Sequence, residues 1–318
     1  MNRETAVLQL FQARGLGQKR LRKLIDALAQ GGDSPEEFVG HPREELLDKI
    51  GLGRETGESI AQARGEAEQL VRLLSRHNIR VVTFLDPGYP SRLNRTLGPE
   101  APPVLFVYGD VSLLERKSVG FCGSRHPSGK AIDLTQHTAA AVANAGFNVV
   151  SGYAGGVDTA AHLAASRAGG ITTIVLPEGI LHFRMKSELG EFADEGTLLV
   201  MSEFPPRLPW AAHNAMQRNS TICGLSDVVV VVEAGSKGGT FEAGRTTLRL
   251  GLELFVLDYP GRPSSAAGNS ELIRRGGHPI KVKADGSVDL TPLLDCLSRN
   301  NGPPSGRDEQ GELFGMIG

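Results

Sequence analysis

The sequence contains only three cysteines among its 318 residues and no excess of either charge. Cys122, Cys223 and Cys296 stand far apart without a C-x-x-C pair. This pattern excludes a disulfide framework and a cysteine-based zinc site, and it is typical of thiols in a reducing cytosol. The formal net charge is −2, so the whole molecule lacks the basic field that marks many nucleic-acid-binding proteins. Any site for a polyanion must therefore be local.

Targeting and membrane segments are also missing from the printed sequence. The amino-terminal run MNRETAVLQLF lacks the uncharged apolar core and the cleavage site of a signal peptide. No apolar run reaches the length that spans a bilayer. We therefore expect a cytoplasmic protein with no membrane contact.

The motifs of common nucleotide-dependent and hydrolytic enzymes do not occur. The sequence has no G-x-x-x-x-G-K-[ST], no G-x-G-x-x-G after the first strand, no H-E-x-x-H and no G-x-S-x-G. His126 and His162 lack a second ligand at metal spacing. We expect neither a metal nor a cofactor, and His162 is expected to pack or hydrogen-bond near a loop.

Residues 1–78 predict a small all-α domain of the helix-hairpin-helix or SAM-like kind. Apolar residues recur at helical spacing around Leu21 to Leu28, and Ser34 begins a run with the pattern of an N-cap, an N1 proline and a capping box. The triplet GLG occurs at 15–17 and at 51–53, each time between two helical stretches. Backbone amides at such turns contact phosphates in some proteins, and an ordinary tight turn is an equal alternative.

Residues 79–297 predict a Rossmann-like, doubly wound α/β domain with a mostly parallel sheet. Continuously apolar runs suit strands buried on both faces, and helical stretches separate them. The last helix is expected at Thr291 and Pro292, and the polar residues 298–318 are expected to form a flexible tail. The apolar runs are VLFVYG, SVGFCG, FNVVSG, TTIVLP, LLVMSE, VVVVVEA and LELFVLD.

Four loops next to these strands carry the residues of a phosphate-binding site. Ligands of open α/β sheets bind at the carboxyl ends of the strands, where glycines allow close backbone approach and helix N-termini donate to anions. Arginine and lysine supply the positive charge. The predicted phosphate-binding residues are Gly123, Ser124, Arg125, Ser151, Gly152, Gly155, Gly156, Arg218, Asn219, Lys237, Gly238, Gly239 and Thr240.

Each loop also has an ordinary structural interpretation. Glycine-rich turns often only connect a strand tightly to a helix. The alternative for Arg125 and Arg218 is that they form surface ion pairs. The alternative for Ser128 and Asp158 is that they cap helices. For Asp158 we favour the cap.

The ordered set of motifs resembles the DNA-processing protein A family, also called DprA or Smf. The resemblance covers residues 79–260 and rests on the G-S-R turn at 123–125, SGYAGGVDTAAH at 151–162, Arg218 with Asn219, and VVEAGSKGGTFEA. It implies a homodimer that binds single-stranded DNA without sequence preference and loads the recombinase RecA during transformation. It implies a mediator and not an enzyme. Tyr153 and Phe241 are candidates for base stacking, with local packing as the alternative.

The sequence departs from the family pattern at several positions. Gly155 replaces a common arginine, Ala215 and Met216 stand in place of a Phe-Pro pair, and Ser220 replaces a second arginine. Fewer cations predict weaker DNA binding. The printed sequence also has no counterpart of the carboxyl-terminal winged-helix domain of many members.

Two other functions remain open. GGTFEAG is similar to part of the motif of cytokinin-activating phosphoribohydrolases, in which Arg218 would hold a nucleotide phosphate and Glu242 would stabilise the ribosyl transition state. The spacing of Glu242 departs from that motif. A nucleotide-binding sensor would use the same loops without turnover.

The predicted tail carries one further motif. Gln310, Leu313 and Phe314 match the Q-x-x-L-F core of peptides that bind the replication sliding clamp. An extended segment inserts two apolar anchors into a pocket in this mode of recognition. A chance match is the alternative.

Overall fold

Helices make up the amino-terminal region. The computed structural model describes residues 2–299 except 43, 192, 193, 195, 262 and 284. Both GLG triplets connect helices, and Ser34 forms the expected capping box with Glu37. The amino-terminal helices are α1 (Arg3–Gln12), α2 (Gln18–Gly31), α3 (Pro35–Gly40), α4 (Glu44–Lys49), α5 (Arg54–Gln62) and α6 (Arg64–Arg76).

A nine-stranded sheet follows in the described part of the chain, in the order β1-β2-β6-β5-β4-β3-β7-β8-β9. The seven predicted apolar runs are strands β2 to β8, which confirms the predicted fold class. The first of them, β2, is antiparallel to both its neighbours β1 and β6, whereas the other adjacent pairs are parallel. The strands are β1 (Ile79–Thr83), β2 (Val104–Tyr108), β3 (Ser118–Cys122), β4 (Asn148–Ser151), β5 (Thr172–Leu176), β6 (Leu198–Ser202), β7 (Val228–Val231), β8 (Glu253–Asp258) and β9 (His278–Lys281).

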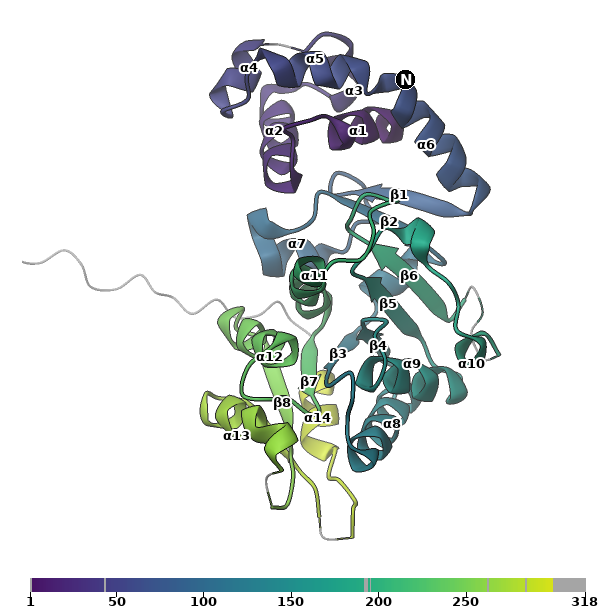
Figure 1. Cartoon of the computed structure of the whole chain (residues 1–318), viewed down its shortest axis with the longest axis vertical. Helices are drawn as coiled ribbons and strands as arrows, with labels where there is room; N and C mark the ends of the chain where they lie inside the picture. The colour runs from purple at the N-terminus through teal and green to yellow at the C-terminus, as the bar shows by residue number, and fades with distance from the viewer. Residues whose placement is uncertain are drawn as a thin grey trace, which may run out of the picture.

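Helices cover both faces of the sheet (Figure 1). Helices α8, α9 and α14 lie on one face, and α7, α11, α12 and α13 on the other. The remaining helices are α7 (Ser91–Leu97), α8 (Gly129–Asn144), α9 (Val157–Arg167), α10 (Ser187–Gly190), α11 (Ala212–Leu225), α12 (Gly239–Arg249), α13 (Ala267–Arg274) and α14 (Thr291–Arg299), with 3-10 turns η1 (Gly98–Glu100), η2 (Val111–Glu115), η3 (Ile180–His182) and η4 (Ser264–Ala266).

The amino-terminal helices share a core with the sheet. Leu8 and Leu24 belong to the same apolar cluster as Phe106, Ile174 and Val200 of strands β2, β5 and β6. This packing covers the β2-β6-β5 end of the face on which α8 and α9 lie. The boundary predicted at residue 78 falls between α6 and β1, and the division of the chain into two domains there stays a prediction.

None of the helices in the described part of the chain has the length and apolar character needed to cross a membrane.

Candidate functional site

The strand order reverses between β3 and β7. Strands β3 to β6 extend the sheet in one direction, and β7 to β9 extend it in the other. Open α/β sheets bind ligands at this point, outside the carboxyl ends of the strands. The loops after β3, β4 and β7 and the amino-terminal half of α11 meet here, so the four predicted loops do converge.

Glycines allow the first two loops to pack against each other. Gly156 has a φ of +75°, and a Cβ there would collide with the Ser124 carbonyl oxygen. The Val157 amide donates to that same oxygen over 3.2 Å. The Thr240 hydroxyl donates to the Gly123 carbonyl over 3.0 Å and ties the loop after β7 to this pair. These contacts make the glycines a requirement of loop packing.

Arg218 lies beneath the surface and not on an exposed rim. Its residue is 4% exposed, Nη1 donates to the Val175 carbonyl over 3.1 Å, and the same nitrogen lies 3.9 Å from Asp158 Oδ2. A Cβ at residue 152 would overlap the guanidinium, so Gly152 leaves the room that Arg218 occupies. Nε is buried and has no hydrogen-bond partner among the described residues. The alternative of a surface ion pair is therefore wrong for Arg218, because its ion pair lies inside the protein.

Asp158 is the buried partner of Arg218. The N-cap of α9 is Gly156, and Asp158 lies in the first helical turn, where Oδ2 accepts from the Ala154 amide over 3.3 Å. Our preference for an Asp158 cap is therefore wrong, whereas Ser128 does cap α8. Burial raises the pKa of the Asp158 carboxyl, and the charge of Arg218 opposes that rise. The pair is an internal support for the loops.

His162 holds the second loop from below. Its Nε2 lies 2.6 Å from the Gly152 carbonyl oxygen, which only accepts, so Nε2 carries the proton, and Nδ1 lies 2.7 Å from the Thr172 hydroxyl. Burial lowers the pKa of His162 to about 4, which keeps the ring neutral at pH 7. The expected hydrogen-bonding role of His162 is confirmed. Ser151 was predicted to bind phosphate, but it is buried and its hydroxyl donates to the Phe121 carbonyl, so that hydroxyl does not face a ligand.

A cavity of about 370 Å³ opens at the meeting point of the loops, and we call it the switch-point cavity. Trp210 and Met216 are 51% and 56% exposed at its edge, and the Arg125 guanidinium lies 5.5 Å from the centre of the Trp210 ring. Sequence reasoning missed Trp210, although it is the only tryptophan of the chain. The cavity is lined by Phe121, Cys122, Gly123, Arg125, Ala154, Asp158, Trp210, Ala212, Ala215, Met216, Arg218, Asn219, Ile222, Gly239 and Thr240.

The other predicted residues occupy different places. Lys237 and Gly238 are exposed on the loop after β7, outside the lining of the cavity, and Gly155 is exposed beside the Arg125 carbonyl. Tyr153 accepts from the Lys186 amide over 2.7 Å, and Phe241 is only 8% exposed within the core. The local-packing alternative therefore holds for both aromatic residues.

The enzymatic alternative finds less support in the geometry. Glu242 pairs with Arg245 at 3.0 Å on the outer side of α12 and does not line the cavity with Arg218. Among the described residues, no three His, Cys, Asp or Glu side chains are grouped so as to hold a metal ion. Gln310, Leu313 and Phe314 lie outside the described residues, and their binding to a sliding clamp stays a prediction.

Comparison with known proteins identifies relatives over most of the chain. The family model described as DNA recombination-mediator protein A matches residues 80–290. DNA processing protein DprA of Bacillus subtilis is 30% identical over 69% of this chain and 76% of its own length. Protein Smf of Escherichia coli is 32% identical over 73% of this chain and 62% of its own length, so more than a third of that relative lies outside the match.

Two solved structures have the same fold. DprA of Streptococcus pneumoniae has a TM-score of 0.73 at 23% identity, covering 88% of this chain and 95% of that one. DprA of Helicobacter pylori has a TM-score of 0.57 at 25% identity, covering 69% and 95%, and its structure describes a single-stranded DNA binding mode.

Proposed function

The chain belongs to the DNA recombination-mediator protein A family, and on that basis we propose that it binds single-stranded DNA at the switch-point cavity. The observation that carries the proposal is the exposed Arg125 and Trp210 pair at the mouth of this cavity. The single-stranded DNA binding mode described for the Helicobacter pylori relative supports the same ligand class.

The proposed contacts divide into two kinds. Arg125 and Lys237 are exposed cations that bind phosphates, while the buried pair of Arg218 and Asp158 holds the loops in place beneath them. Trp210 offers a flat surface on which a base stacks, and Met216 adds an adaptable apolar contact. Neither contact distinguishes one base from another. Binding is therefore sequence-tolerant and depends on salt.

We further propose that the bound strand leaves chemically unchanged and that the protein presents it to the recombinase RecA. Four loops that hold one another through backbone and side-chain hydrogen bonds make a preformed binding surface. A homodimer is also part of the proposal, since symmetric dimers are the commonest assemblies of soluble proteins.

Removing the exposed cations tests the proposal. We expect Arg125→Ala and Lys237→Ala each to weaken binding of oligo-dT and to lower the slope of log K against log salt by about 0.7, the value for one phosphate contact on a single strand. Fluorescence anisotropy over several salt concentrations measures both quantities. Nucleoside monophosphates as competitors distinguish a strand from a mononucleotide ligand.

The matched controls are Arg76→Ala at the end of α6 and Lys281→Ala on β9. Both remove an exposed cation away from the switch-point cavity. If the slope of log K against log salt were equal in all four variants, the assignment of Arg125 and Lys237 as phosphate contacts would be contradicted. If a nucleoside monophosphate displaced the labelled oligo-dT and unlabelled single strands did not, the result would favour a nucleotide-binding sensor.

Restoring the missing cation of the second loop should strengthen binding. Gly155 is exposed, and the nearest atom to an added Cβ is the Arg125 carbonyl oxygen at 3.7 Å, an ordinary contact. We expect Gly155→Arg to add one phosphate contact and to raise affinity about fivefold near 0.1 M salt, with a steeper salt slope by about 0.7. Gly65→Arg, at an open position on α6, is the control for added charge alone. Equal gains in both variants would show a non-specific effect.

A further inference from the structure

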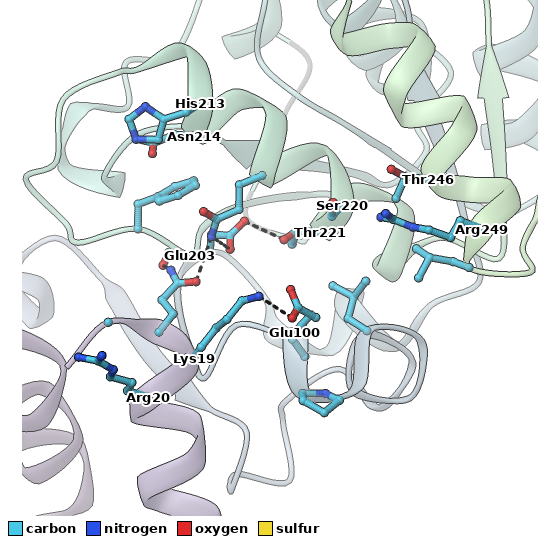
Figure 2. A pocket seen from close by; sticks show the side chains of 18 of the residues that line it. Lys19, Arg20, Glu100, Glu203, His213, Asn214, Ser220, Thr221, Thr246 and Arg249 are labelled. Atoms are coloured by element: carbon cyan, nitrogen blue, oxygen red, sulfur yellow. Dashed lines mark hydrogen bonds and ion pairs between the residues drawn. The ribbon is translucent and has the colours of Figure 1, made fainter. Parts of the chain in front are cut away.

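A second, larger cavity lies where the amino-terminal helices meet α11 and α12 (Figure 2). Its volume is about 880 Å³, and we call it the junction cavity. It is lined by the first GLG turn, the beginning of α2, the segment around η1, one side of α11 and the end of α12. None of the phosphate-binding residues predicted for the loops of the sheet belongs to it, whereas Gly15 and Gly17 of the first GLG turn do.

Helix α11 separates the two cavities. Ala212, Met216 and Asn219 line the switch-point cavity, whereas His213 and Gln217, on the same turns of the helix, line the junction cavity. An α-helix with its side chains is about 10–12 Å across. A strand that leaves the first cavity therefore reaches the second by crossing the amino-terminal turns of one helix.

The beginning of α2 presents free donors to the junction cavity. Gly17 is the N-cap, and no side chain caps this fourteen-residue helix. The first backbone amides of a helix have no partner inside it and favour an anion. Lys19 and Arg20 follow in the first turn and also line the cavity.

A buried amide supplies an independent sign of a ligand. Asn214 is 4% exposed and lines the junction cavity, and its side chain makes no hydrogen bond with any described residue. The residue as a whole is buried, and its unpaired amide is left to bond with whatever fills the cavity. Arg249 enters from α12 and likewise has no ion-pair or hydrogen-bond partner in the described part of the chain. Figure 2 shows both residues at the cavity, on different helices.

The two carboxylates of the junction cavity already have partners. Glu100 pairs with Lys19 at 2.6 Å. Glu203 is 2% exposed and accepts from Thr221 over 2.7 Å and from Gln217 over 2.9 Å, and burial raises the pKa of its carboxyl. The groups that remain for a ligand are mainly donors, which favours an anion over a cation.

From this arrangement we propose that the junction cavity is a second nucleotide subsite, which binds a phosphate of the same single strand after the strand has crossed α11. The proposal rests on the proposed function, because a strand must occupy the switch-point cavity first. The apolar residues Leu97, Phe204 and Leu250 in the same lining provide room for a sugar or a base.

Oligonucleotide length separates the two cavities in an experiment. We expect Arg249→Ala to weaken binding of an oligo-dT of about 20 nucleotides roughly fivefold near 0.1 M salt, the effect of one lost phosphate contact. Binding of a thymidine tetranucleotide, which fills only the first cavity, should not change. Arg245→Ala is the matched control, because Arg245 lies one turn earlier on α12 and outside the lining.

A second variant removes the anion site while preserving the fold. Gly17 has an extended backbone, and an added Cβ meets no atom within 4 Å. Gly17→Asp places a carboxylate where it caps α2, so the melting temperature should stay equal or rise slightly. Affinity for the long oligonucleotide should nevertheless fall at least as much as in Arg249→Ala, since the new carboxylate occupies the donors and repels phosphate.

The outcomes distinguish failure of the subsite from failure of the proposed function. Unchanged affinity in Arg249→Ala and Gly17→Asp, with wild-type binding intact, would overturn the second subsite alone. Wild-type protein that binds neither oligonucleotide would overturn both proposals. A third outcome is that the wild-type protein binds deoxythymidine monophosphate, that Arg249→Ala abolishes this binding, and that affinity for the long oligonucleotide is unchanged. The ligand of the junction cavity would then be a free nucleotide and not the strand, which would overturn the subsite as stated.

Discussion

Arg218→Met is expected to lower the free energy of unfolding by about 3–5 kcal/mol, the usual cost of leaving one charge of a buried pair without its partner. Asp158 would remain inside the protein with only the Ala154 amide and neighbouring polar groups to stabilise its negative charge. Methionine fills a comparable volume, so the loss reports charge and hydrogen bonding more than a cavity. Chemical denaturation at pH 7 measures the change.

The size of this loss should depend on pH. Burial raises the folded-state pKa of Asp158 above 3.8, so the folded protein binds this proton more readily than the unfolded chain. The contribution of Asp158 to stability therefore falls as pH rises from 3.8 to its higher pKa in the folded protein. Without Arg218 the folded pKa rises further, and the deficit of the variant should be largest near neutral pH and smallest in acid. Arg218→Met combined with Asp158→Asn should recover part of the stability at pH 7.

A pH-independent deficit, or a double variant no more stable than Arg218→Met, would contradict this account of the pair. The comparison is made between variants at each pH, because other buried groups, including His162, also titrate in acid.

Trp210→Ala is expected to weaken binding of single-stranded DNA by about 1–3 kcal/mol, or roughly 5- to 150-fold, the range for loss of one base-aromatic stack. The ring is 51% exposed, so the fold should lose little stability when it is removed. Trp210→Phe keeps an aromatic face and should restore most of the affinity. Anisotropy of a labelled oligo-dT measures the series.

The same residue provides a direct optical signal. Trp210 is the only tryptophan of the chain, so intrinsic indole fluorescence reports this position alone. Quenching on addition of oligo-dT, absent with duplex DNA, is the expected result. Unchanged fluorescence together with unchanged affinity in Trp210→Ala would show that the strand binds elsewhere.

The sequence predicts the sheet because buried parallel strands need continuous apolar runs. Every run from β2 to β8 met that requirement. The edge strands β1 and β9 were missed, since IRVVT and HPIK contain exposed or polar positions and so lack a continuous apolar run. The antiparallel direction of β2 depends on its pairing with β6, almost 100 residues away, and no local pattern encodes it.

The convergence of the loops at the candidate site was predictable from the sequence, but the burial of its residues was not. The rule that ligands bind at the carboxyl ends of parallel strands, together with the glycine turns, predicts that Arg125, Arg218 and Lys237 lie at one end of the strands. The burial of Arg218 depends on a carboxylate from α9 and a carbonyl from β5, which meet only in the folded protein. Trp210 stands in a proline-containing loop without periodicity, and a single exposed aromatic leaves no pattern to detect.

The core shared by the amino-terminal helices and the sheet has a consequence for synthesis on the ribosome. Leu8 and Leu24 pack in one cluster with Ile174, Leu198 and Val200. At roughly 5–20 residues per second, the first helices leave the ribosome on the order of ten seconds or more before β6 does. Nascent chains shorter than about residue 200 therefore expose apolar helix faces, and chaperones that act on such surfaces have their longest opportunity during this interval.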